Sequence, residues 1–121
     1  MNSFTDIEQS KKLAEILPIE SADMRYSPLG DNMHPWIWTD TFIEKDAIPC
    51  WSLAALLDVL PQKYYSIKDH ETNLILGKHK DKWCALYWDA TGMQDGEQTL
   101  GDSPVDACVA MIEKLHEQNL L

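Results

Sequence analysis

The stretch 102–116 constrains the fold more than any other part of the chain, because several signals in it predict the same helix. Ser103, or Asp102 before it, is a residue type that caps helix N-termini, and Pro104 follows at the first helical position, where a missing amide hydrogen costs nothing. Apolar residues then recur at steps of three and four, which places them on one helix face. They are Val105, Cys108, Val109, Ile112 and Leu115. We expect this face to bury against a sheet or another helix.

Two more helices are predicted upstream. Residues 5–8 match a capping box, with threonine first and glutamate three residues later, so a helix is expected over 6–17. The other helix is expected over 48–61, with Pro49 in its first turn and Pro61 at its end. Its buried stripe is expected to comprise Leu53, Leu56, Leu57 and Leu60.

Three runs rich in β-branched and aromatic residues lie between the second and third helices, at 64–68, 72–76 and 83–88. The polar residues between them predict an antiparallel meander, and 97–100 is a candidate fourth strand. Period two in the third run places Cys84, Leu86 and Trp88 on one face and Trp83, Ala85 and Tyr87 on the other. The predicted fold class is α+β, a small antiparallel sheet of three to four strands with two or three helices packed on it.

A length of 121 residues suits one domain, which can bury roughly two-thirds of its unfolded surface without disulfides or metals. We expect a single domain over 1–121. Its first part, 1–18, is expected to be a loosely attached N-terminal helix. An irregular segment rich in aromatic residues follows over 19–49, and 50–121 is expected to form a helix–sheet–helix core.

The charge of the chain restricts its partners. Twenty acidic and ten basic residues give a net charge of −10, and Arg25 is the only arginine. A phosphate backbone would be repelled, so we expect no nucleic-acid partner. The apolar runs are too short for a membrane and the first residues do not match a secretory signal, which favours the cytoplasm and no membrane contact. Three cysteines without paired spacing indicate reduced thiols.

The sequence predicts no catalytic residue, no metal site and no cofactor. Its cysteines and histidines lack the short paired spacings of zinc sites, and glycine-rich phosphate-binding motifs are absent. Cys50 is the one thiol to test as a nucleophile, since the N-terminus of the helix that it precedes would lower its pKa. An ordinary packed thiol is the favoured interpretation of Cys50. The carboxylates of the polar region 89–102 are best explained as solvated.

Tryptophan is the residue type that points to binding. Of the five in the chain, Trp36 and Trp38 lie in the irregular segment, on the same side if that segment is extended. Tryptophan is enriched in interface hot spots, so Trp36 and Trp38 are the predicted binding residues. The alternative is a loop held to the core by its aromatic side chains. The basic run 78–82, at a predicted hairpin tip, could dock an acidic partner, although a solvated turn is the favoured explanation.

Two segments together resemble a family of small proteins from phages, prophages and gut Bacteroides genomes. They are Pro-Cys-Trp-Ser-Leu-Ala-Ala-Leu-Leu-Asp-Val-Leu-Pro at 49–61 and Ser-Pro-Val-Asp-Ala-Cys-Val-Ala-Met-Ile-Glu-Lys-Leu-His-Glu at 103–117. No activity is assigned to this family, so the resemblance implies a bacterial or phage cytoplasmic setting and no catalytic residues. A weaker similarity is to HicB-type antitoxin α+β domains, in which a strand like 83–88 leads through a polar turn into a helix like 104–115. This chain differs by placing the helix 53–60 before the strands.

The predicted function is a non-enzymatic accessory or protein-interaction domain of phage or mobile-element type. Its unidentified protein partner is expected to contact Trp36 and Trp38. Two copies of the chain that contact each other through these residues, as a homodimer, are the alternative. The alternatives are a small enzyme that uses Cys50 or a carboxylate, and an acidic inhibitor that mimics nucleic acid.

Overall fold

The computed structural model describes residues 3–27, 34–37, 46–65, 71–89 and 94–121. The contacts divide the chain into two compact units, one of Asn2–Val59 and one built from Leu60–Leu121. The single domain expected over 1–121 therefore stays a prediction. Among the helices that the described residues form, none is long and apolar enough to cross a membrane.

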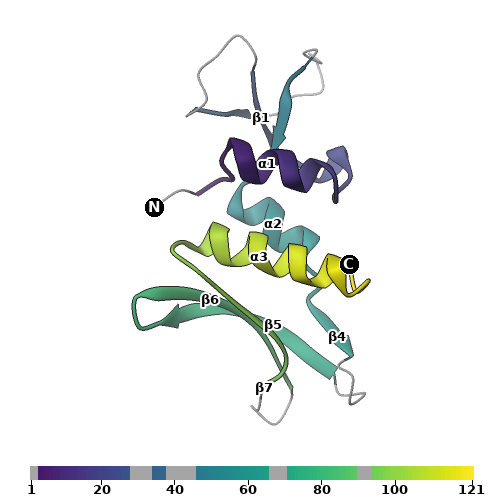
Figure 1. Ribbon diagram of the computed structural model, residues 1–121, viewed down its shortest axis with the longest axis vertical. Helices are drawn as coiled ribbons and strands as arrows, with labels where there is room; N and C mark the ends of the chain where they lie inside the picture. The colour runs from purple at the N-terminus through teal and green to yellow at the C-terminus, as the bar shows by residue number, and fades with distance from the viewer. Residues whose placement is uncertain (1–2, 28–33, 38–45, 66–70, 90–93) are drawn as a thin grey trace. The chain divides into compact units, whose positions relative to one another are not determined.

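The unit Asn2–Val59 contains a small antiparallel sheet whose strands lie in the order β2-β1-β3. Helix α1 packs against β3, and α2 contacts the short 3-10 helix η1 (Figure 1). In chain order the elements are α1 (Ile7–Ala14), η1 (Ile19–Ser21), β1 (Met24–Tyr26), β2 (Trp36–Ile37), β3 (Ile48–Cys50) and α2 (Leu53–Val59). The segment 19–49, which was expected to be irregular, contains η1, β1, β2 and the first residues of β3, and 28–33 and 38–45 lie outside the described residues.

The start of α1 differs from the capping box predicted over 5–8. Asp6 is the N-cap, and its side chain accepts a hydrogen bond from the backbone N of Gln9 at 2.8 Å. The Gln9 side chain in turn accepts one from the backbone N of Asp6 at 3.0 Å. The box is therefore present one residue later than predicted, because aspartate and glutamine can fill the same two roles. This shift releases the hydroxyl of Thr5 for contacts inside the unit.

The helix predicted over 48–61 is wrong in its first part. Residues 48–50 form β3, where Pro49 lies opposite Arg25 of β1, and α2 begins only at Leu53. The Oγ of Ser52 accepts a hydrogen bond from the backbone N of Ala55 at 3.2 Å, which caps the start of α2. Since proline is tolerated at strand edges as well as in the first turn of a helix, the sequence pattern did not separate the two positions.

The unit built from Leu60–Leu121 is a four-stranded antiparallel meander followed by a long helix (Figure 1). Its strands lie in the order β4-β5-β6-β7, and they are β4 (Lys63–Tyr65), β5 (Glu71–His79), β6 (Lys82–Asp89) and β7 (Gln94–Gly101). A tight turn at Lys80, whose φ is 57°, joins β5 to β6. The predicted meander is confirmed, and its candidate fourth strand is longer than expected. The α+β fold class is confirmed as well.

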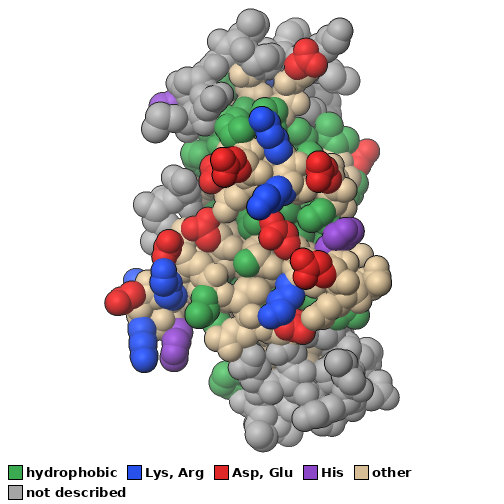
Figure 2. Space-filling view, in the orientation of Figure 1, with side chains coloured by type: hydrophobic (Ala, Val, Ile, Leu, Met, Phe, Trp, Pro, Cys, Tyr) green, Lys and Arg blue, Asp and Glu red, His purple; other side chains and the backbone are tan. Residues whose placement is uncertain are grey.

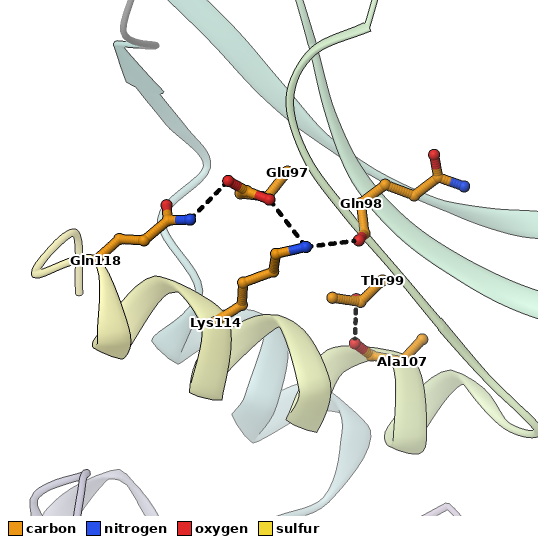
Figure 3. Close-up of polar contacts among 6 residues, drawn as sticks. All are labelled: Glu97, Gln98, Thr99, Ala107, Lys114 and Gln118. Carbon is orange, nitrogen blue, oxygen red and sulfur yellow. Dashed lines mark hydrogen bonds and ion pairs between the residues drawn. The ribbon is translucent and has the colours of Figure 1, made fainter.

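Helix α3 (Pro104–Glu117) packs on β6 and β7 as its apolar face predicted. Ser103 is its N-cap and accepts a hydrogen bond from the backbone N of Asp106 at 3.1 Å, with Pro104 in the first turn. The Oγ1 of Thr99 on β7 donates to the carbonyl of Ala107 at 2.8 Å (Figure 3). Helix and sheet are thus joined by a polar contact beside the apolar packing.

A second set of contacts joins the last turns of α3 to β7. The Nζ of Lys114 lies 3.0 Å from the carboxylate of Glu97 and donates to the carbonyl of Gln98 at 3.5 Å (Figure 3). The Nε2 of Gln118 donates to the same Glu97 carboxylate at 2.6 Å. These hydrogen bonds, that from Gln118 first, lower the pKa of Glu97.

The four-stranded sheet has one face toward α3 and one face away from it. Thr99 contacts α3 and lies opposite Ala85, so Ala85 and Tyr87 share the α3 side, and both are fully buried. The alternation predicted for 83–88 is therefore present. Its other face, with Cys84, Leu86 and Trp88, points away from α3.

Candidate interaction site

The predicted binding residue Trp36 lies on β2, at one edge of the three-stranded sheet. Its side chain is 60% exposed, and that of its neighbour Ile37 is 75% exposed. Successive strand residues point to opposite faces, so the two exposed side chains flank the strand on both sides. Trp38, the other predicted binding residue, lies outside the described residues.

Among the described strands, β2 is paired on one side only. Its partner is β1, with Met24 opposite Ile37 and Arg25 opposite Trp36. No further strand follows β2 in the described part of this sheet. An edge strand presents backbone donors and acceptors to an incoming strand, and exposed apolar side chains add to that attraction. Ile37 was missed at the sequence level, although a β-branched residue between two tryptophans is the signal for a strand at this point.

The thiol of Cys50 is fully buried at the end of β3. The Sγ of Cys50 donates to the backbone carbonyl of Thr5 at 3.4 Å, and the Thr5 hydroxyl lies 3.5 Å from the sulfur. Burial raises the pKa of Cys50, which is opposite to the shift expected from a helix N-terminus. An enclosed neutral thiol is a poor nucleophile.

The other groups around Cys50 are also suited to structure. The hydroxyl of Tyr26 donates to the backbone carbonyl of Thr5 at 2.7 Å, and burial, with Cys50 beside it, raises the pKa of Tyr26 far above its ordinary value. The Oγ atoms of Thr5 and Ser10 lie 2.8 Å apart. All these groups are neutral hydrogen-bonding partners, so the cluster holds α1, β1 and β3 together. The nearby carboxylate of Asp23 raises the pKa of Cys50 further, which also disfavours a thiolate.

Within the described residues, no three His, Cys, Asp or Glu side chains are grouped as metal ligands would be. The three cysteines are all reduced and buried. The basic run 78–82 does lie at the β5–β6 turn, where a histidine and several basic side chains gather in Figure 2. Part of this charge is already neutralised, because Lys82 forms an ion pair with Asp102 that raises the pKa of Lys82. Lys78 lies over the ring of Trp83, with its Nζ 5.7 Å from the ring centroid.

The acidic residues are spread rather than gathered on the face drawn in Figure 2. Red carboxylate side chains alternate there with blue lysine side chains. A protein that imitates a phosphate backbone needs closely spaced negative charges, which this face does not present. The carboxylates of that face therefore give no support to the inhibitor hypothesis.

Comparison of the chain with known protein families, with curated proteins and with solved structures found no match. The two resemblances stated from the sequence therefore stay predictions. The exposed edge strand β2 is the described feature that best fits the predicted binding role.

Proposed function

We propose that this chain is a non-enzymatic protein-interaction domain whose contact surface is β2, with Trp36 and Ile37 as its anchors. The observation that carries the proposal is the exposure of two large apolar side chains on an edge strand. Water is released when both side chains are covered, and an added strand would hydrogen-bond to the edge of β2 that no described strand covers. A protein segment that docks in extended form would use both features.

The proposed partner is a protein, with the chain acting in the cytoplasm as an accessory factor of phage or mobile-element type. A net charge of −10 opposes binding to nucleic acid. The buried Cys50, with its raised pKa, gives no support to the alternative of a cysteine-dependent enzyme. A second copy of the chain that adds its own β2 to this edge would give a homodimer.

The test is affinity capture of the tagged chain from its native host, compared with a Trp36→Ala/Ile37→Ala variant. A matched control is Ile19→Ala, since Ile19 is also exposed and belongs to the same unit. We expect a protein that binds the parent and the control but not the double variant. Circular dichroism and urea unfolding of each variant confirm that the fold is retained.

Binding that survives the double variant would show that β2 is not the contact surface. Binding that is lost equally in the Ile19→Ala control would also contradict the proposal, because the effect would not be specific to β2. Capture of no protein by the parent would count against an interaction role.

A further inference from the structure

We draw no further inference here: the strongest candidate, the exposed apolar side chains of Ile75, Trp88 and Leu100 on the face of the four-stranded sheet that points away from α3, shares that face with polar and charged residues, and nothing in the described structure shows what covers it.

Discussion

Two hydrogen bonds join Thr5 and Trp51, although 46 positions separate them in the chain. The backbone N of Thr5 donates to the carbonyl of Trp51 at 2.9 Å, and the backbone N of Trp51 donates to the Thr5 hydroxyl at 3.1 Å. Thr5 is fully buried and also contacts Ser10 and Cys50. One hydroxyl thus joins the start of α1 to the segment between β3 and α2.

Thr5→Val should destabilise the chain, because valine has nearly the same shape but no hydroxyl. The backbone N of Trp51 and the hydroxyl of Ser10 would lose their buried partner, at a cost of ~1–3 kcal/mol. Urea unfolding followed by circular dichroism measures the loss. Thr5→Ser keeps the hydroxyl and should recover most of the stability. The prediction is contradicted if Thr5→Val is as stable as the parent, or if Thr5→Ser loses as much stability as Thr5→Val.

The role of Thr5 illustrates which parts of the fold could be predicted from the sequence. Helix α3 and the meander were predictable because their periodicity and caps lie in contiguous residues, as at Ser103. Thr5 was assigned to a helix cap from the three residues that follow it, and its bond to Trp51 has no local signal. The three-residue strands β1 and β3 are likewise too short for a pattern, so their pairing depends on contacts far apart in sequence.

Gly101 and Gly77 both lie in strands, but a side chain would meet opposite surroundings at the two positions. A Cβ at Gly101 would lie 2.6 Å from the backbone N of Ala107 and 2.9 Å from the backbone carbonyl carbon of Asp106. Because backbone cannot move aside as a side chain can, Gly101→Ala should separate β7 from the start of α3 and cost ~1–3 kcal/mol. Gly77→Ala is the matched control and should be neutral or slightly stabilising. Thermal unfolding of both variants compares them, and equal midpoints would contradict the predicted close packing at Gly101.

The pKa of Glu97 predicts a pH dependence of stability. It is lowered from 4.5 in the folded chain, so the carboxylate stabilises the fold fully above pH 4.5. As the pH falls below 4.5, the unfolded chain takes up the proton before the folded chain does. The stabilising contribution of Glu97 therefore decreases, and it is lost once the pH has passed below the pKa of Glu97 in the folded chain. Glu97→Gln should therefore be less stable than the parent at pH 7, with the difference shrinking as the pH falls below 4.5.

The measurement for Glu97 is urea unfolding of parent and variant from pH 3 to pH 7. Glu117→Gln provides the control, since Glu117 is an exposed carboxylate at the end of α3, the helix that Glu97 contacts through Lys114. A Glu97→Gln difference that is constant across this range would mean that packing, not charge, accounts for it.

The thiols should be protected in the folded chain. All three cysteines are buried, and burial raises the pKa of Cys50 and that of Cys108, the latter to about 11. Little thiolate then exists at pH 8, and reagent reaches the sulfur only after local opening. We expect reaction with a disulfide reagent to be ~100-fold or more slower than in denaturant, as an opening cost of a few kcal/mol implies. One fast equivalent in the native chain, lost in Cys50→Ser, would revive the nucleophile hypothesis.

The candidate site could be predicted only in part, because the sequence does not show which tryptophans lie at the surface. Trp36 was identified from its residue type and its irregular surroundings, but composition does not tell a surface tryptophan from a core one. The difference is set by sheet order: β2 is an edge strand, while Trp51 follows β3 and is fully buried. Which face of the four-stranded sheet α3 covers could not be predicted either, for a related reason. Period two identified two faces of β6, yet which face α3 covers depends on the contact of Thr99 with Ala107.

Substitution should therefore change the stability of the chain little at Trp36 and strongly at Trp51. Trp36 is 60% exposed, so Trp36→Ala should change the free energy of unfolding by less than ~0.5 kcal/mol. Trp51 is fully buried and its Nε1 donates to the Oγ of Ser21 at 3.0 Å, so Trp51→Phe should cost ~1–3 kcal/mol through a cavity and a lost hydrogen bond. Urea unfolding of the two variants makes the comparison. A large loss from Trp36→Ala would place that side chain among the structural residues and remove β2 as a binding surface, whereas a small loss leaves it free to contact a partner.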